Sequence, residues 1–299
     1  MNNLKTWLVY NGSLQSHKFT ELLAWLSNSL QKHGVDATLV NNGSLPAYIN
    51  GSLTSLRRGM GELPDFVVFW DKDIRLAMQL EALGLRLFNT SSAIGICDDK
   101  SLTHITLANE GILMPKTIIA PLVFPGLKDS DGRFTEYIED ELSYPMVVKE
   151  SFGSFGAQVY LVKNGRELRE MREKLLYTPH LYQEFIASSY GRDVRVQVVG
   201  GEATASVQRT SENDFRANAS NGGRMNVFQP PREFTDMAVQ CCRIIGTDFA
   251  GVDMLFGQEG QPVLCEVNSN AHFKNLYHCT GIDVAEHMVR HMLKVIGND

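Results

Sequence analysis

The sequence predicts a mixed fold, in which an α/β region around a parallel sheet precedes an α+β region built as two lobes around a cleft. Strands and helices alternate over residues 1–95, hairpins of short strands dominate residues 186–299, and a glycine-rich turn joins two strands between them. Alternation along the chain is typical of a parallel sheet covered by helices, whereas hairpins build antiparallel sheets. We therefore expect three lobes, at residues 1–95, 96–185 and 186–299.

Hydrophobic periodicity gives each element its expected place. In the first lobe, strands are expected at 7–10, 37–40, 66–70 and 85–88, and helices at 19–33 and 74–83. In the other lobes, strands are expected at 146–149, 159–163, 194–199, 203–208, 250–256 and 262–268, and helices at 100–110, 167–177, 234–245 and 282–296. Gly34 and Gly84 are expected to end the first two helices, because glycine readily adopts the left-handed conformation that closes a helix. Asp99 can cap the helix that begins at Lys100.

The composition excludes several classes of protein. The 299 residues include 43% hydrophobic and 21% charged residues, which is usual for a globular protein. A net charge of −6 argues against a nucleic-acid partner, and no apolar run approaches the ~20 residues that cross a bilayer. The five cysteines form no Cys-x-x-Cys pair and the first residues show no export pattern, so we expect reduced thiols in a cytoplasmic protein. Three Asn-Gly-Ser triplets, at Asn11, Asn42 and Asn50, predict turns.

Two carboxylates and an amide come together in the last expected hairpin. A turn at residues 259–260 would place Asp253 directly opposite Glu266 on the neighbouring strand. Asn268 follows Glu266 by two positions, so the pleat of the strand puts both side chains on one face. Carboxylates this close repel one another unless a cation lies between them, and ligands that are all oxygen atoms favour Mg²⁺. The alternative is a solvated face of an edge hairpin.

The glycine-rich turn at residues 149–157, called the glycine loop below, is a candidate phosphate-binding element. It is not a Walker loop, because no Gly-Lys-Ser/Thr opens a helix there. A glycine-rich turn between strands can still present backbone N–H groups to phosphates, with Lys149 as a point charge at the strand end. The alternative is a plain hairpin.

Taken in order, these segments resemble the ATP-grasp superfamily and, within it, the RimK-type α-L-glutamate ligases. The resemblance covers nearly the whole chain, and its matching segments lie at 89–100, 111–115, 144–149, 182–186, 191–195, 214–218, 251–253 and 266–268. The narrower match rests on Asp-Phe-Arg-Ala-Asn at 214–218, the glycine pair at 222–223 and the segment at 280–285. One segment alone would be weak support, but the whole set in this order is specific. The resemblance implies an ATP-grasp fold, in which an N-terminal parallel-sheet lobe precedes two α+β lobes that clasp ATP.

The resemblance also implies an ATP site in the cleft. Two lysines, Lys100 and Lys149, would neutralise the α- and β-phosphates, and Asp193 would accept hydrogen bonds from the ribose hydroxyls. The segment at 184–186 would form the hinge between two lobes, where the backbone reads the adenine edge. The expected ATP-binding residues are Lys100, Lys149, Gln183, Glu184, Phe185, Ile186, Asp193, Arg216 and Asn218.

The metal and catalytic residues follow from the same resemblance. Asp253, Glu266 and Asn268 would bind Mg²⁺, with Mn²⁺ as the alternative ion. The expected catalytic residues are Arg195, Arg209 and Arg216. The first two would stabilise an acyl phosphate or clamp a substrate carboxylate, since a guanidinium binds oxyanions through two parallel hydrogen bonds. For Arg209 the alternative is a surface ion pair.

Two segments depart from the family pattern and concern the acceptor. The loop after the expected metal strand reads Asn-Ser-Asn-Ala-His-Phe-Lys at 268–274, and the glycine loop carries Phe152 and Phe155. We expect Phe155 and Phe273 to contact an acceptor whose terminal carboxylate is attached to an apolar or planar body; the alternative is that they pack a closed loop. His272 is a candidate substrate contact or an exposed loop residue. The pair His287 and His291, four residues apart, fits a structural helix face better than a metal site.

The implied function is that of an ATP-dependent carboxylate–amine ligase. A carboxylate attacks the γ-phosphate, and the resulting acyl phosphate then reacts with an amine. The expected substrates are glutamate or a similar amino acid and a small-molecule or peptide carboxylate acceptor. We expect no nucleic-acid or membrane partner, and a homo-oligomer stays open. The alternatives are an ATP-grasp kinase and a non-catalytic ATP-binding module.

Overall fold

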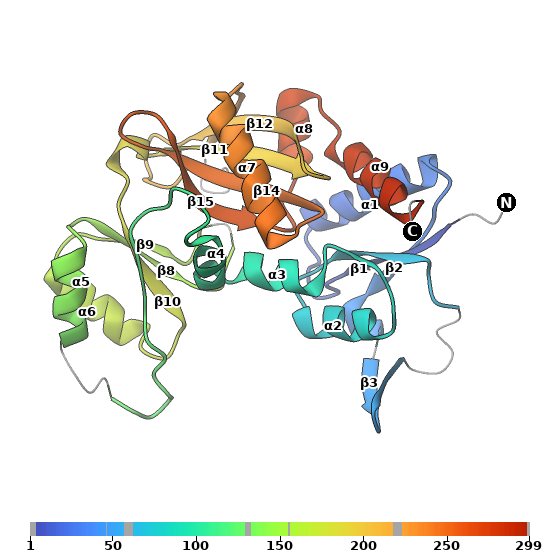
Figure 1. The fold of residues 1–299 in the computed structure, drawn as a ribbon, viewed down its shortest axis with the longest axis horizontal. Helices are drawn as coiled ribbons and strands as arrows, with labels where there is room; N and C mark the ends of the chain where they lie inside the picture. The colour runs from blue at the N-terminus through green and yellow to red at the C-terminus, as the bar shows by residue number, and fades with distance from the viewer. Residues whose placement is uncertain are drawn as a thin grey trace.

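The structure is a computed structural model that describes residues 4–45, 47–56, 62–128, 133–154, 156–217 and 223–297. Asn218 and Phe155, both singled out above, lie outside the described residues. The main sheets can be followed in Figure 1: a small one at the left with α5 and α6, a larger one at the top with α7, and the N-terminal sheet at the right with α1 and α2. The predicted combination of α/β and α+β regions is confirmed.

The N-terminal sheet is parallel, as predicted, and its strand order is β2-β1-β5-β6. Its elements are β1 (Lys5–Tyr10), α1 (His17–Lys32), β2 (Asp36–Asn41), β5 (Phe66–Trp70), α2 (Ile74–Ala82) and β6 (Leu87–Phe88). Every residue of β5 is buried, because α1 covers one face of the sheet and α2 covers the other. Gly34 and Gly84 follow the two helices at φ +75° and +84°, so both predicted helix stops are confirmed.

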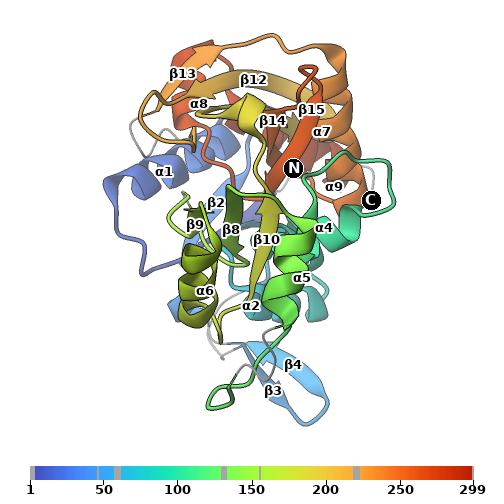
Figure 2. The same ribbon diagram turned by 90° about the vertical axis from the view of Figure 1, so that its left-hand side faces the viewer.

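A hairpin that the sequence did not predict projects from this sheet (Figure 2). Its elements are β3 (Ala47–Asn50) and β4 (Leu53–Leu56), preceded by the 3₁₀ turn η1 (Asn42–Ser44). Gly51, in the turn of the hairpin, has φ +62°. The predicted turns at Asn42 and Asn50 are therefore confirmed. The two strands were not predicted because four residues are too few to show the alternation of apolar and polar side chains that marks a strand.

The central sheet is antiparallel, with the order β7-β10-β8-β9. Its elements are β7 (Thr117–Ile119), α5 (Arg133–Glu141), β8 (Met146–Glu150), β9 (Val159–Val162), α6 (Gly165–Lys174) and β10 (His180–Glu184). Alternate residues of β8 face opposite sides. Met146 and Val148 pack beneath α5 and α6, so Val147 and Lys149 point away from those helices. The glycine loop leads from β8 to β9.

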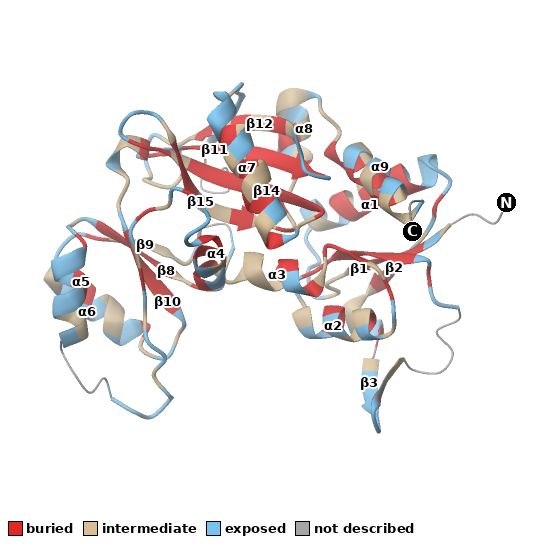
Figure 3. Cartoon of the chain, viewed as in Figure 1, coloured by how far each residue is buried: buried red, intermediate tan, exposed pale blue. Residues whose placement is uncertain are grey.

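The largest sheet is antiparallel, with the order β13-β12-β11-β14-β15. Its elements are β11 (Arg192–Val199), β12 (Glu202–Thr210), β13 (Arg224–Val227), α7 (Arg232–Ile245), β14 (Phe249–Phe256) and β15 (Pro262–Asn268), with the 3₁₀ turn η2 (Ala187–Ser189) before β11. Its apolar face packs under α7, and the inner strands β11 and β14 are buried almost throughout, whereas the edge strand β13 is largely exposed (Figure 3). The chain passes from the central sheet to this one between Glu184 and Arg192.

Helices far apart in the sequence join the lobes. The helices α3 (Ser91–Asp98) and α4 (Lys100–Leu107) pack with α7 in the core of the largest sheet. Asp99 caps α4 as predicted, because its side chain accepts from the backbone N–H groups of Ser101 and Leu102. The helices α8 (Lys274–Thr280) and α9 (Val284–Ile296) share a core with α1 and β5. The first and last parts of the chain thus form one hydrophobic core. In the part of the chain that the structure describes, no helix is both long and apolar enough to span a membrane.

Candidate active site

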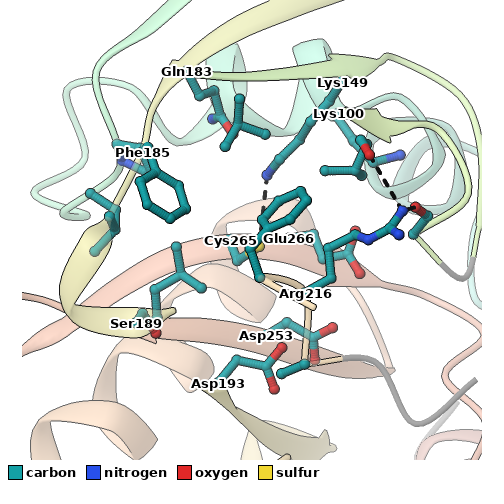
Figure 4. A pocket seen from close by; sticks show the side chains of 18 of the residues that line it. Lys100, Lys149, Gln183, Phe185, Ser189, Asp193, Arg216, Asp253, Cys265 and Glu266 are labelled. Atoms are coloured by element: carbon teal, nitrogen blue, oxygen red, sulfur yellow. Dashed lines mark hydrogen bonds between the residues drawn. The ribbon is translucent and has the colours of Figure 1, made fainter. Parts of the chain in front are cut away.

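A cavity lies between the polar faces of the central and the largest sheet (Figure 4). From the central sheet, Val147, Lys149 and Gln183 line it on the face opposite α5 and α6. From the largest sheet, Asp193, Arg209, Asp253, Glu266 and Asn268 line it on the face opposite α7. The cavity is therefore enclosed by two sheets whose helices lie on the outside. It collects the sequence-predicted residues Lys100, Lys149, Gln183, Glu184, Phe185, Ile186, Asp193, Arg209, Arg216, Asp253, Glu266 and Asn268, whereas Arg195 lines the neighbouring cavity described below.

Two buried lysines, Lys100 and Lys149, point toward this cavity. Their exposed fractions are 8% and 7%. The Nζ of Lys100 donates to the carbonyl oxygen of Gly153 at 3.3 Å, and the Nζ of Lys149 lies 3.7 Å from the Sγ of Cys265. Within the described ranges, neither ammonium group has a carboxylate at salt-bridge distance. Burial lowers the pKa of Lys100, which indicates that its charge is poorly solvated. Among the described residues, the two lysines therefore present positive charge that no carboxylate contacts directly, and Glu266 across the cavity offsets that of Lys100 only in part.

The glycine loop is contacted by side chains from two other lobes. Gly153 has φ +138°, and a Cβ there would lie 2.4 Å from Oε1 of Gln158. From the largest lobe, Arg216 donates to the carbonyl oxygen of Gly156 while Asp214 holds its guanidinium. From the N-terminal lobe, the Nζ of Lys72 donates to the Oγ of Ser154 at 3.2 Å. Ser154 and Gly156 of the loop are therefore each bound by another lobe, and Lys72 is a contact that the sequence did not reveal.

A chain of four alternating charges crosses the polar face of the largest sheet. Arg195 donates to both oxygens of Asp253 at 2.6 Å, and Arg209 donates to both oxygens of Asp193 at 2.7 and 2.6 Å. Each pair lies directly opposite across neighbouring strands. Arg209 also approaches the Oδ2 of Asp253 at 2.9 Å, which joins the two pairs. The four side chains, called the charge ladder below, are 2–14% exposed.

The charge ladder shifts the protonation of its members. Burial works against the charge of Asp253, but Arg195 and Arg209 outweigh it and hold the pKa of that carboxyl well below its usual range. Burial dominates at Asp193, whose pKa is raised in spite of Arg209. The two carboxylates raise the pKa of Arg209 against the effect of burial. The alternative prediction of a surface ion pair for Arg209 is therefore wrong, because its guanidinium is buried between two carboxylates.

The predicted pairing of Asp253 with Glu266 is confirmed, although the turn differs. The loop between β14 and β15 is closed by a hydrogen bond from Gly257 N to Gln261 O, so the turn has three residues instead of two. A bulge at Cys265 then shifts the register by one residue and restores the pairing. A longer turn and a bulge thus compensate each other.

The oxygen donors of this hairpin fit a divalent cation. Glu266 accepts a hydrogen bond from the amide of Asn268 at 3.2 Å, and that amide also lies 3.5 Å from Asp253. Carboxylates and an amide oxygen are the donors that Mg²⁺ prefers. Asp253, however, already receives Arg195 and Arg209 on its oxygens. Metal binding would therefore require Asp253 to share its oxygens with, or release, a guanidinium. Among the described residues, no three His, Cys, Asp or Glu side chains group to form a metal site by themselves.

The expected hinge lies at the edge of the cavity, where β10 ends. Phe185 packs edge-on against Tyr190 and Phe215. The buried side chain of Gln183 binds the Nε2 of His104 at 2.8 Å and the Oγ1 of Thr117 at 2.9 Å, so its amide is already engaged within the protein. Burial lowers the pKa of His104 to about 3, which keeps this imidazole neutral. His104 is a supporting residue that the sequence gave no reason to single out.

A second cavity, of ≈ 730 Å³, adjoins the first and reaches the N-terminal sheet. The two share Ser154, Arg209, Glu266 and Asn268. His272 lines the second cavity, and burial lowers its pKa to about 4. Phe273 is fully buried against Trp25 and Trp70, so the prediction that it contacts an acceptor is wrong. The reason is α8, which begins directly after Phe273 and turns its ring into the core.

The two C-terminal histidines show no metal-site geometry. His291 contacts Asp248 at 3.2 Å and the ring of Phe88, which joins α9 to the N-terminal lobe. His287 lies on the same helix, and the described residues contain no third side chain that would complete a metal site with the pair. The prediction of a structural helix face therefore agrees with the contacts of His291.

This fold, with lysines and carboxylates facing each other between two α+β lobes, is that of the ATP-grasp ligases. The ligase PsnB, solved with Mg, ADP and a variant of its minimal precursor, superposes with a TM-score of 0.71 at 15% identity, covering 99% of this chain and 100% of that one. A family model described as RimK-like ATP-grasp domain matches residues 97–292. The chain therefore belongs to the RimK-like ATP-grasp family, and the predicted resemblance is confirmed.

Two relatives show the spread of the family. The chain is 35% identical over 217 residues to beta-citrylglutamate synthase B of Danio rerio, which covers 72% of this chain and 52% of that protein. It is 31% identical over 220 residues to the glutamate–LysW ligase ArgX of Sulfolobus acidocaldarius, covering 71% of this chain and 74% of that protein. The chain thus spans about half the length of the first relative and three quarters of the second.

Proposed function

We propose that the protein is a Mg-ATP-dependent ligase that joins a carboxylate to an amine through an acyl phosphate. The observation that carries the proposal is the pair of buried lysines, Lys100 and Lys149, without a carboxylate partner among the described residues. Two buried positive charges are costly unless an anion balances them, and a nucleotide's phosphates supply that charge. The cavity that they line also holds oxygen donors suited to Mg²⁺ on its opposite wall.

The chemistry proceeds in two transfers. A carboxylate oxygen of the acceptor attacks the γ-phosphorus of ATP, the bond to the β-phosphate oxygen breaks, and ADP leaves. The amine then attacks the acyl carbon, and the tetrahedral oxyanion collapses to an amide and free phosphate as the amine loses a proton. Lys100 and Lys149 stabilise the charge that develops on the phosphates. Bound Mg²⁺, held by Glu266, Asn268 and Asp253, would supply further neutralisation at the same oxygens.

The glycine loop protects the intermediate. An acyl phosphate hydrolyses if water reaches it, so a ligase must close over its substrates. Arg216 and Lys72 hold this loop at Gly156 and Ser154, from two different lobes. We assign two roles to Arg216: it holds the loop closed and it contacts the phosphates. The first role follows because its guanidinium is bound to Asp214 and to the loop at once.

The amine substrate is proposed to be glutamate or a similar amino acid. Supporting this, the two relatives are named for glutamate: one is a beta-citrylglutamate synthase and the other a glutamate–LysW ligase. Their acceptors differ, so the acceptor here is proposed only as a small-molecule or peptide carboxylate. The second cavity provides its space next to Glu266 and Asn268. The five cysteines are free, which supports a reducing, cytoplasmic location.

The test is an incubation of the protein with Mg-ATP, L-glutamate and a pool of carboxylate acceptors. We expect ADP, free phosphate and an acceptor that gains one amino acid with loss of water. A phosphorylated product without free phosphate would instead indicate a kinase. Nucleotide binding without any ADP, across amino acids and acceptors, would indicate a non-catalytic module and overturn the proposal.

A further inference from the structure

The carboxyl ends of β1 and β5 meet at the second cavity. In the order β2-β1-β5-β6, the chain leaves β1 toward β2 on one side and returns to β5 on the other. In such open parallel sheets, the crevice outside the two strand ends is the usual place for a ligand. Asn11 follows β1 and Asp71 follows β5; their side chains are joined by a hydrogen bond of 3.2 Å, and both residues line the cavity.

Asp71 is a buried acid without a cationic partner. It is 6% exposed. Its Oδ1 accepts from the backbone N–H of Lys72 at 2.7 Å as well as from Asn11, whereas its Oδ2 is buried and has no hydrogen-bond donor within 3.5 Å among the described residues. Among the described residues, no cationic side chain lies within 4.0 Å of the carboxylate. Burial raises the pKa of Asp71 against the lowering effect of Lys72 N–H and the Asn11 and Asn42 amides.

Three of the cationic side chains that line the cavity with Asp71 are already paired with other carboxylates. These ion pairs are Lys72 with Asp98, Lys274 with Glu21 and Arg195 with Asp253. A ligand cation is therefore the group that would balance Asp71, just as a ligand anion would balance the lysines of the first cavity.

Two neighbours of Asp71 extend the pattern. The amide Nδ2 of Asn270 donates to the backbone oxygen of Asp71 at 2.9 Å, which leaves the buried Oδ1 of Asn270 without a donor. The Nε1 of Trp70 is likewise buried without an acceptor. Both residues line the cavity. Unpartnered buried polar atoms are uncommon in folded proteins, and three of them beside one cavity match a ligand with several donors and at least one acceptor.

The beginning of α1 supplies positive potential on the same wall. His17, Lys18 and Phe19 line the cavity, and no acidic residue lies in the first turn of this 16-residue helix. Ser16 makes no side-chain capping hydrogen bond. The positive end of the helix dipole therefore favours a carboxylate at this end of the cavity.

We propose that this wall of the second cavity is the subsite for the α-amino acid, in which Asp71 and Asn270 accept hydrogen bonds from its ammonium group. The carboxylate of the same ligand lies toward Trp70 and the beginning of α1. This assignment rests on the proposed function, because it gives the binding site of the amine substrate in its protonated form, before it reacts. The subsite lies where the N-terminal lobe, which supplies Asp71, meets the loop after β15, which supplies Asn270.

The experiment measures binding, so it does not depend on the unidentified acceptor. The protein, with Mg²⁺ and a non-hydrolysable ATP analogue, is screened by thermal shift against the protein L-amino acids, and the best binder is titrated by calorimetry beside its deaminated analogue. For L-glutamate that analogue is glutarate. We expect wild-type protein to prefer the amino acid by ~10-fold or more, because a charge-assisted hydrogen bond to a buried carboxylate is lost with the ammonium.

Asp71→Asn tests the residue, and Asp36→Asn is its control. Asn keeps the acceptor for Asn11 and Lys72 N–H, and Asp36 is an exposed acid at the amino end of β2 in the same sheet. We expect Asp71→Asn to bind the amino acid only as well as the deaminated analogue, with unchanged affinity for the nucleotide, and Asp36→Asn to behave as wild type. Asn270→Ala is a second variant should Asp71→Asn not fold, and we expect the same loss of preference.

Three outcomes would overturn the proposal: no amino acid binds, wild type does not discriminate against the deaminated analogue, or both cavity variants keep the full preference. These outcomes differ from a failure of the ligase function. A protein that binds an amino acid through Asp71 but releases no ADP retains the subsite and loses the proposed reaction.

Discussion

The two sheets on either side of the first cavity differ in how their cationic side chains are paired. On the central-sheet side, Lys100 and Lys149 are buried without a carboxylate partner in the described structure. On the opposite side, the buried Arg209 and the partly buried Arg195, which reaches the second cavity, have bidentate partners at 2.6–2.7 Å. The difference separates two uses of buried charge. An unpaired buried cation is set for a ligand's anion, whereas a paired one fixes the geometry of its neighbours until something displaces it.

The comparison changes the assignment of Arg195 and Arg209. Sequence alone predicted that they clamp a substrate carboxylate or an acyl phosphate. In the structure their donors are taken by Asp253 and Asp193, so either arginine can bind substrate only by exchange. A cation that takes oxygens of Asp253 would provide that exchange at Arg195, which lines the second cavity.

The largest expected effect is on stability and comes from Asp253→Ala. The substitution removes the carboxylate that binds the partly buried Arg195 and the buried Arg209, and breaking a buried pair from one side costs about 3–5 kcal/mol of unfolding free energy. Chemical denaturation measures it. The matched control is Glu62→Ala, which breaks the exposed Lys5–Glu62 pair at 2.9 Å and should change the unfolding free energy far less. Equal losses in the two variants would show that the ladder is not a structural unit.

The next effect is on turnover and comes from Glu266→Ala. Glu266 is half-buried and contacts only Asn268 among the described hydrogen bonds, so its loss should spare the fold. If it holds Mg²⁺, the ADP release rate should fall by roughly 10²–10³-fold, since the metal contributes several kcal/mol of charge stabilisation. ADP release is measured beside a thermal melt. An undiminished rate would remove Glu266 from the metal site.

Much of the secondary structure and part of the candidate site could be predicted from local sequence. Most predicted helices and strands end within a few residues of their positions, because each is a continuous apolar pattern bounded by glycine or a capping residue. The convergence of Asp253, Glu266 and Asn268 could also be predicted, since it needs only the pleat of one hairpin. The predicted pairing of Asp253 with Glu266 is correct although the predicted turn is one residue too short, because the bulge at Cys265 shifts the register back by one residue.

The rest depends on contacts that no local pattern encodes. The charge ladder requires β11 to lie between β12 and β14. The sequence of β11 does not specify that β14, which follows much later in the chain, is its neighbour. The burial of Phe273 depends on α8 and α9 packing against α1, a contact between the two ends of the sequence. Asp71 and Asn270 meet for the same reason. Residues that are joined only by tertiary packing were therefore missed or given the wrong surroundings.

A smaller effect is expected for nucleotide affinity in Lys149→Ala. A charge-assisted contact to phosphate contributes about 1.5–3 kcal/mol, so the Kd for ATP should rise ~10–100-fold. The control is Lys163→Ala, an exposed lysine just after β9 at the other end of the glycine-loop hairpin, which should leave the Kd unchanged. A change within about twofold in Lys149→Ala, or ~0.4 kcal/mol, would mean that the glycine loop is only a turn.

The smallest effect is a pH dependence that distinguishes an unpaired lysine from a paired arginine. Burial lowers the pKa of Lys100 from 10.5, so the free protein loses this proton at a lower pH than an exposed lysine would. A bound phosphate favours the charged form, and nucleotide binding must then take up a proton wherever Lys100 is already neutral. While the phosphates of ADP stay fully ionised, its affinity should be constant below the lowered pKa of Lys100 and fall as pH rises from there toward the higher pKa that Lys100 has in the complex.

The stability of the nucleotide-free protein should move in the opposite direction. Between the lowered pKa and 10.5 the unfolded chain binds more protons at this lysine than the folded one, so the contribution of Lys100 to unfolding free energy rises with pH and is lost again as pH falls through the folded pKa. Lys100→Arg should remove both trends, because a guanidinium stays charged throughout. Calorimetric ADP titrations and denaturation from neutral to alkaline pH measure the two. If wild type and Lys100→Arg show the same alkaline decline in affinity, another group titrates, and Lys100 is not the unpaired charge that receives the phosphate.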